Sequence, residues 1–281
     1  MTDASSQYHG EEYWNDLHSE HHGSLKAVGQ RGLSISYNSL KYRSEADSFK
    51  KITSSISITP NTILELGVGT GFWTDQMFAL WGNSIKVTGV DLSAVAISEL
   101  CTRRPEINGI VGNLGVLPTD TFDRQFDCVT AVMVFLHITD ETQFINALNL
   151  AARSVRGGGV LIVYEPFLSR RYSPFRASNY GAIHNKVRER RIFDNLLKLE
   201  GLDAIYEFSG STWIINSPIE ANLTLNFKLM NILWQFLSAT IYKSNALVKL
   251  STCVLLMVDK FCKRQSLSRS GNFVLYKKTQ E

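Results

Sequence analysis

Short apolar runs and amphipathic stretches follow one another along the chain, which predicts strands that alternate with helices. Residues 62–66, TILEL, form a run typical of a buried strand, and residues 72–81 have the length and apolar content of a helix. Gly82 follows directly and suits the left-handed position at which many helices end. The glycine-rich residues between the two segments therefore form a turn from a strand into a helix.

The next segment repeats this order. Residues 85–91 are rich in β-forming residues and end at Asp91, and Ser93 is placed to cap a helix over residues 94–104. Two strands that alternate with two helices predict an α/β fold with a parallel sheet. In such sheets, ligands bind beyond the carboxyl ends of the strands.

The turn after the first strand has glycine at alternate positions: Gly67, Gly69 and Gly71. Glycine allows a sharp bend and lets a ligand approach main-chain N–H groups at the start of a helix. A carboxylate at the end of the second strand, Asp91, is placed to accept hydrogen bonds from both hydroxyls of an adenosine ribose. These features fit a nicotinamide dinucleotide and S-adenosylmethionine equally well.

Three details separate the two ligands. The dinucleotide fingerprint G-x-G-x-x-G needs a glycine where this chain has Phe72. Glu65, inside the strand, is a poor neighbour for a pyrophosphate but a suitable partner for an ammonium or sulfonium cation. The turn is not followed by G-K-[ST], so a nucleoside triphosphate site is not indicated. Together these details favour S-adenosylmethionine.

With these features, the segment ELGVGTG at residues 65–71 and the acid Asp91 resemble motifs of the class I S-adenosylmethionine-dependent methyltransferases, particularly those that act on small molecules. The resemblance runs over residues 63–164. It implies a Rossmann-like, seven-stranded, mostly parallel sheet flanked by helices, with S-adenosyl-L-methionine as cofactor and S-adenosyl-L-homocysteine as product. In this family the glycine turn contacts the methionine part of the cofactor, and the acid that matches Asp91 holds the ribose.

Later blocks extend the resemblance in the same order. Residues 109–118 match the third strand and the turn after it, with Asn113 where many relatives have an acid. The amide oxygen of Asn113 can accept from the adenine amino group as an acid does, next to the backbone of Leu114. Residues 126–137 and 156–166 match the fourth and fifth strands.

The resemblance thus implies a set of cofactor contacts. They are Glu65, Gly67, Gly69, Thr70, Gly71, Asp91, Leu92, Asn113, Leu114 and Val132, with Tyr37 and Arg43 added from an N-terminal lid. Aromatic lid residues cover the cofactor in similar methyltransferases, and Arg43 is expected to pair with the cofactor carboxylate. Asp127 is expected to be a residue at the start of a strand rather than a ligand.

Methyl transfer from a sulfonium requires an acceptor held in line and shielded from water. A hydroxyl acceptor also benefits from a base, for which His137, at the end of the fourth predicted strand, and His184 are the candidates. His137 has an alternative role in packing or hydrogen bonding, which a histidine has at this position in many relatives. No metal site is expected, because the acids of catechol-type methyltransferases are missing and the N-terminal histidines fit no tetrahedral pattern.

The substrate is expected to contact the segment after the fifth strand. Residues 168–191 contain seven basic residues and one acid, with Tyr172, Phe175 and Tyr180 among them. A solvated surface segment would have the same composition. The position favours a binding role, in which Arg170, Arg171, Tyr172 and Arg176 recognise an anionic acceptor such as a carboxylate, a phosphate or a sugar nucleotide.

The remaining residues divide into additions to the core. We expect an N-terminal helical lid over residues 1–55, the cofactor-binding core over 56–221, a helical insertion over 222–265 and the final strand within 266–281. The apolar runs of the insertion are too short or too often interrupted to span a bilayer. Packing on the active-site face or in a homodimer interface is favoured over contact with a membrane surface.

Charge and cysteine content limit which partners and which cellular location are expected. The chain has 29 basic and 26 acidic residues, too small an imbalance to indicate a nucleic-acid partner. The N-P-P-[YF] signature of nucleic-acid N-methylation is also missing after the fourth strand. Four cysteines without disulfide or metal spacing suggest reduced thiols, and the first residues have no features of a secretory signal, so a cytoplasmic location is expected.

The sequence therefore predicts direct methyl transfer to a hydroxyl oxygen of a small-molecule or glycan-type acceptor. N- or C-methylation in secondary, lipid or quinone metabolism is the nearest alternative, because these motifs do not encode the shape of the acceptor pocket. From other classes, a non-catalytic cofactor-binding protein would have degraded glycine or acid positions, and an NAD-dependent oxidoreductase would have the glycine that Phe72 replaces.

Overall fold

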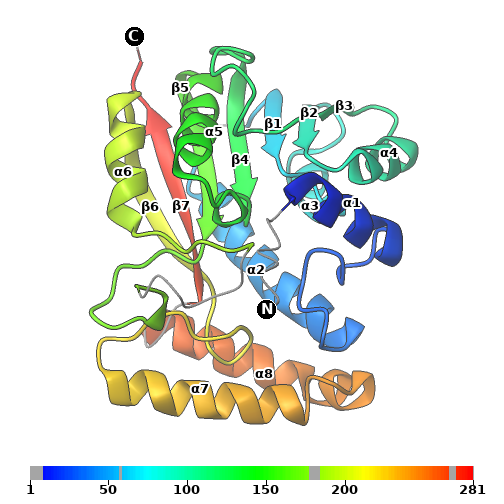
Figure 1. The fold of residues 1–281 in the computed structure, drawn as a ribbon, viewed down its shortest axis with the longest axis vertical. Helices are drawn as coiled ribbons and strands as arrows, with labels where there is room; N and C mark the ends of the chain where they lie inside the picture. Colours follow the sequence, from blue (N-terminus) through cyan, green and yellow to red (C-terminus); the bar gives the residue numbers. More distant parts are fainter. Residues whose placement is uncertain (1–8, 57–58, 177–183, 266–269, 281) are drawn as a thin grey trace, which may run out of the picture.

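A computed structural model describes residues 9–56, 59–176, 184–265 and 270–280. In these residues seven strands form one sheet in the order β3-β2-β1-β4-β5-β7-β6 (Figure 1). The strands are β1 Thr62–Leu66, β2 Lys86–Asp91, β3 Asn108–Val111, β4 Phe126–Val132, β5 Val155–Glu165, β6 Leu202–Ser211 and β7 Gly271–Lys278. The first five are parallel, and β7 runs antiparallel to both β5 and β6. The prediction of a seven-stranded, mostly parallel sheet is confirmed.

Helices connect the strands and flank the sheet. They are α1 Gly10–His21, α2 Ile35–Ser54, α3 Phe72–Trp81, α4 Ala94–Arg103, α5 Glu141–Ser154, α6 Arg190–Leu199, α7 Thr224–Ala239 and α8 Asn245–Gln265, with 3-10 turns η1 Phe135–His137 and η2 Pro174–Arg176. Side-chain caps fix several starting points, because Ser34, Ser93 and Asp140 each accept a hydrogen bond from a main-chain N–H of the first turn. The predicted cap at Ser93 is thus observed.

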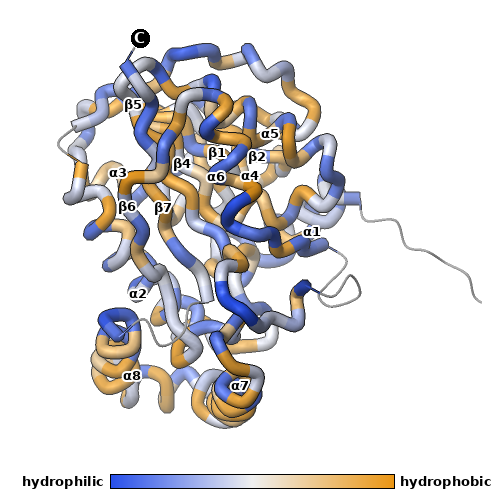
Figure 2. Tube along the Cα trace, turned by 90° about the vertical axis from the view of Figure 1, so that its left-hand side faces the viewer, coloured by the Kyte–Doolittle hydropathy of each residue, from blue (hydrophilic) through white to orange (hydrophobic). Residues whose placement is uncertain are grey.

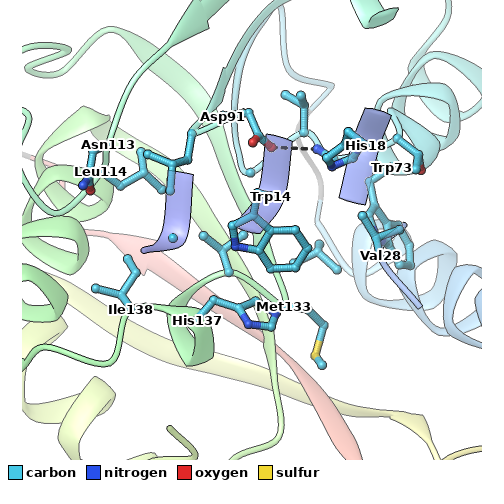
Figure 3. Close-up of a pocket in the computed structure, with 18 of the residues that line it drawn as sticks. Trp14, His18, Val28, Trp73, Asp91, Asn113, Leu114, Met133, His137 and Ile138 are labelled. Carbon is cyan, nitrogen blue, oxygen red and sulfur yellow. Dashed lines mark hydrogen bonds between the residues drawn. The ribbon is translucent and has the colours of Figure 1, made fainter. Parts of the chain in front are cut away.

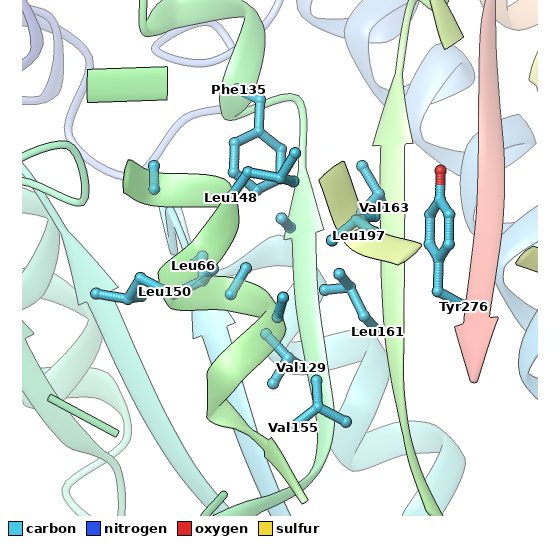
Figure 4. Packing of buried hydrophobic residues seen from close by; sticks show 14 of the residues in the cluster. Leu66, Val129, Phe135, Leu148, Leu150, Val155, Leu161, Val163, Leu197 and Tyr276 are labelled. Atoms are coloured by element: carbon cyan, nitrogen blue, oxygen red, sulfur yellow. The ribbon is translucent and has the colours of Figure 1, made fainter. Parts of the chain in front are cut away.

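Two hydrophobic layers cover the two faces of the sheet. On one face, Leu148 of α5 and Leu197 of α6 pack against Val129 and Leu161 of the central strands (Figure 4). On the other face, apolar residues of α2, α3 and α4 form a second buried cluster with the same strands. Each fully buried leucine or valine contributes about 1.5–3 kcal/mol relative to an exposed one, so the two layers hold the strand ends in fixed positions.

The segment between β6 and β7 folds as the two helices α7 and α8, as predicted. They lie together at one end of the molecule, below the end of the sheet to which β4 points (Figures 1 and 2). Trp234 of α7 and Tyr242, from the turn between the helices, pack on Tyr37 of α2 in a third buried cluster. None of the helices described is long and apolar enough to cross a membrane.

Candidate functional site

A cavity of about 780 Å³ lies at the carboxyl ends of β1, β2 and β4 and is covered by α1 and by residues of α2 (Figure 3). The topology places it there, because the parallel strands all end at this edge and the chain turns outward after each of them. Nine of the residues singled out from the sequence line it: Gly67, Gly69, Thr70, Asp91, Leu92, Asn113, Leu114, Val132 and His137. The structure therefore brings most of the expected cofactor contacts together in one cavity.

The glycine turn after β1 has a conformation that other residues adopt at a cost. Gly67, Gly69 and Gly71 all have positive φ, at 74°, 52° and 74°. A Cβ atom on Gly67 would lie 2.4 Å from Cγ2 of Val134, so the turn is also packed too closely for a side chain there. Gly71 precedes α3 and does not line the cavity.

Asp91 links the end of β2 to the glycine turn. Its carboxylate accepts hydrogen bonds from the backbone N–H of Gly69 at 2.9 Å and of Ser93 at 2.8 Å. Burial raises the pKa of Asp91, and these N–H groups oppose that shift. Each carboxylate oxygen can accept further hydrogen bonds, and Figure 3 shows the group facing the cavity and His18. Asp91 is thus fixed as an acceptor on the cavity wall.

The turn after β3 supplies another wall. Asn113 uses its side-chain oxygen to accept from the N–H of Gly115 at 2.9 Å, which orients the amide beside Leu114. Both residues line the cavity, next to Asp91 and Leu92 at the end of β2. An amide beside an apolar side chain on this wall of the cavity fits a flat polar ring such as adenine.

Glu65 lies behind the glycine turn rather than on the cavity surface. Its Oε2 accepts from the hydroxyl of Thr74, but its Oε1 has no hydrogen-bond partner among the described residues. Burial raises the pKa of Glu65 to about 8. A buried carboxyl oxygen without a partner normally requires an explanation, and a cationic ligand group nearby would provide one.

His137 lies at the end of η1 and points into the cavity under Trp14 of α1 (Figure 3). Its Nδ1 is 3.1 Å from the backbone oxygen of His184, so Nδ1 carries the proton and Nε2 keeps its lone pair. Burial lowers the pKa of His137 to about 4, which makes the ring neutral at physiological pH. His184 does not line the cavity and stacks on Tyr13 with ring centres 4.9 Å apart.

The N-terminal helices contribute further residues to the cavity; of these, Trp14, Lys41 and Glu45 were not predicted from the sequence, and His18 was considered there only as a metal ligand. Trp14 and His18 of α1 are one helical turn apart, as are Lys41 and Glu45 of α2. Spacing of four residues places side chains on one helix face, so this was the available signal. Lys41 and Glu45 form a buried ion pair at 3.0 Å, and Glu45 also accepts from the hydroxyl of Tyr164 at 2.7 Å.

We expect the Lys41–Glu45 pair to contribute to stability as well as to the shape of the cavity. Lys41→Met should lower the free energy of unfolding by about 2 kcal/mol, because the buried carboxylate of Glu45 loses its counter-ion. Urea denaturation measures this. Lys50→Met, at an exposed position on the same helix, is the control and should change stability by less than about 0.5 kcal/mol. An equal loss in both variants would contradict the expectation.

The two lid residues expected to contact the cofactor lie elsewhere. Tyr37 is fully buried in the third cluster, where its hydroxyl donates to the backbone oxygen of Ile215 at 2.7 Å. Arg43 is exposed. Helix geometry explains the position of Arg43, because α2 turns Lys41, Tyr42 and Glu45 toward the cavity and Arg43 is on the opposite face. Tyr37 is on the same side of α2 as Lys41 but one turn earlier, where it packs against Trp234 and Tyr242 outside the cavity.

The expected substrate residues also lie outside the cavity. Arg176 pairs with Glu189, and the side chain of Arg170 donates to Asn222 at 3.2 Å. Tyr172 packs edge-on against Phe227 of α7, and Arg171 is exposed. The part of the segment before residue 177 contacts the start of the insertion, and residues 184–188 contact η1 and Glu141, so the charges of Arg170 and Arg176 are used in contacts outside the cavity. Tyr180, noted with these residues, lies outside the described residues.

Comparisons with known proteins agree with this geometry. Residues 63–159 match a family model described as a methyltransferase domain, whereas no curated protein matches the chain. One similar solved structure is a chain from the complex of the Haloferax volcanii Trm112 methyltransferase activator with a methyltransferase; its TM-score is 0.55 at 14% identity, over 92% of this chain and 98% of that one. A second is the N-methyltransferase NodS of Bradyrhizobium japonicum with S-adenosyl-L-homocysteine, with a TM-score of 0.50 at 13% identity, over 86% of this chain and 88% of that one. A third is phosphoethanolamine N-methyltransferase 2 of Haemonchus contortus, with a TM-score of 0.53 at 16% identity, over 95% of this chain and 61% of that one. At these identities the likeness establishes the fold.

Proposed function

We propose that this protein, a class I S-adenosylmethionine-dependent methyltransferase, methylates a hydroxyl oxygen of a small-molecule acceptor. The observation that carries the proposal is the position of His137. Its neutral imidazole lies in the same cavity as the glycine turn and Asp91, so a base and a cofactor site share one enclosed space.

The residues present fit the cofactor. Asp91 would hold the ribose hydroxyls, Asn113 and Leu114 the adenine, and Gly67 and Gly69 the methionine part, where a Cβ would close the turn. The partnerless Oε1 of Glu65 is the acceptor that a nearby ammonium group would satisfy. When bound, S-adenosyl-L-methionine supplies the electrophilic methyl group, and S-adenosyl-L-homocysteine is the product.

The acceptor would occupy the part of the cavity between α1, α2 and η1. Trp14 and Tyr42 supply flat apolar surface there, and the Lys41–Glu45 pair supplies polar groups. The two charges of the pair neutralise each other, so the pocket favours an uncharged hydroxyl compound over the anionic acceptor expected from Arg170 and Arg176. Trp14 also covers His137 and helps to exclude water.

His137→Gln should lower kcat at least tenfold at saturating cofactor. Removing a general base usually lowers the rate on the order of 100-fold or more. A base with a pKa of about 4 accepts a proton weakly, so we expect a smaller loss here. Transfer of labelled methyl groups to a panel of hydroxyl compounds measures this, and mass spectrometry with NMR identifies the methylated atom. His184→Ala, outside the cavity, is the control and should change kcat less than about threefold.

Two results would overturn parts of this proposal. If the methylated atom is nitrogen or carbon, the hydroxyl assignment is wrong and the alternative acceptor chemistry replaces it. If His137→Gln keeps kcat within about threefold, the residue orients or packs and is not a base.

We also propose a cytoplasmic location, which the four unpaired cysteines support.

A further inference from the structure

Helix α8 carries a complete apolar stripe that none of the described residues covers. Leu247, Leu250, Val254, Met257 and Phe261 recur at alternating intervals of three and four residues, and all five side chains are exposed. The stripe runs from the start of α8 almost to its end. The face of α8 that packs on the protein is a different one, which includes Val248, Leu255 and Cys262.

Helix α7 carries a second stripe of the same kind. Leu225, Leu229, Ile232, Leu233 and Phe236 lie on one side of the helix and are exposed, whereas Trp234 anchors the opposite side in the core. Together with Leu223, these helices hold eleven of the nineteen large apolar side chains that are exposed in the described residues. Apolar surface gathered in this way marks a site that contacts another apolar phase.

Charge gathers on the same helices. Residues 222–265 contain six basic residues and one acid, a net charge of +5, and the acid, Asp259, is buried. The rest of the chain has 23 basic and 25 acidic residues, a net charge of −2. Lys228, Lys249 and Lys260 are exposed beside the apolar stripes. The surface is therefore apolar, positively charged and without an exposed acid.

We propose that α7 and α8 dock onto the surface of an anionic lipid bilayer. Apolar side chains would enter the boundary of the acyl chains, and the basic side chains would contact negatively charged headgroups, which is the pattern of helices that lie in a membrane interface. A second copy of this chain fits less well. A symmetric contact would place two surfaces of charge +5 against each other without an exposed acid to pair with them.

The docking helices are fixed to the helix that lines the cavity. Asp259 of α8 accepts from the hydroxyl of Ser44 on α2 at 2.6 Å and pairs with Lys263 at 2.9 Å. On α2, Lys41 and Glu45 face the cavity. The bilayer would thus lie on the side of the molecule to which the carboxyl ends of the strands point (Figure 1), so docking presents the cavity side to the membrane.

Co-sedimentation with lipid vesicles tests the proposal on the full chain. We expect binding to vesicles of phosphatidylcholine mixed with phosphatidylglycerol, little binding to phosphatidylcholine alone, and release at high salt. The triple substitution Lys228→Glu, Lys249→Glu and Lys260→Glu should weaken partitioning roughly 100-fold. Leu250→Asp with Met257→Asp should do so at least tenfold. Retained binding of S-adenosyl-L-homocysteine shows that a variant is folded.

The controls carry substitutions of the same two kinds elsewhere on the surface. Lys86→Glu with Lys198→Glu alters exposed lysines outside the two helices, and Leu199→Asp alters a leucine that is 84% exposed on α6. Neither should reduce vesicle binding more than about twofold. The proposal is overturned if wild-type protein binds neither vesicle, if the controls lose as much as the variants, or if the protein is a dimer that Leu250→Asp dissociates and that does not bind lipid.

Discussion

Asp91→Ala should weaken binding of S-adenosyl-L-homocysteine roughly 100- to 1,000-fold in calorimetric titration. The carboxylate would accept two ribose hydroxyls, and a hydrogen bond to a charged group contributes about 1.5–3 kcal/mol. The substitution also leaves the N–H groups of Gly69 and Ser93 without the acceptor that holds the glycine turn. Both losses act on the same ligand, so the effect should exceed that of any other single wall residue.

Asp127→Ala is the matched control for this experiment. Asp127 is likewise a buried carboxylate that accepts from two backbone N–H groups, those of Asn61 and Thr62, but it lies at the other end of the sheet, outside the cavity. Asp127→Ala should lower stability without a comparable loss of affinity for S-adenosyl-L-homocysteine. Titration of the same samples with NAD tests the oxidoreductase alternative. Binding of NAD instead, or unchanged homocysteine-analogue affinity in Asp91→Ala, would refute the assignment of the site.

The parts of the fold that the sequence predicts well are those set by local chemistry. The first strand and its glycine turn could be predicted directly, because an apolar run and glycines with positive φ determine the backbone conformation within a few residues. Asp91 could be placed from its position at the end of a strand, since parallel strands bring those ends to one edge, whereas Asn113 was placed by the family resemblance. Asp127 was expected near the start of a strand, and it is the second residue of β4.

Residues contributed by distant segments were harder to place. Whether Lys41 or Arg43 faces the cavity depends on the rotation of α2, which is set by its contacts with β6 and α8 and not by its own pattern. The charge of the segment that contains Arg176 suggested a ligand, but charge alone does not distinguish a binding site from ion pairs such as that with Glu189. The sequence also gave no direct sign that the apolar stripes of α7 and α8 stay uncovered.

The affinity for S-adenosyl-L-homocysteine should rise with pH between about 6 and 8, by up to tenfold per unit, because binding releases a proton from Glu65. In the free protein, burial holds the pKa of this carboxyl at about 8, so it is protonated below that pH. An ammonium group beside its partnerless Oε1 would favour the ionised form and lower that pKa. Binding then becomes easier as pH rises and levels off above about 8.

Calorimetry at several pH values, in two buffers of different ionisation enthalpy, measures both the affinity and the proton released. Glu65→Gln cannot ionise and should remove the pH dependence. Glu165→Gln is the matched control, because burial also raises the pKa of Glu165 to about 8 but its Oε1 accepts from the N–H groups of Val134 and Phe135, whereas Oε1 of Glu65 has no partner among the described residues. It should keep the slope. A flat profile in the wild type, or a slope that persists in Glu65→Gln, would show that Glu65 does not meet the cation.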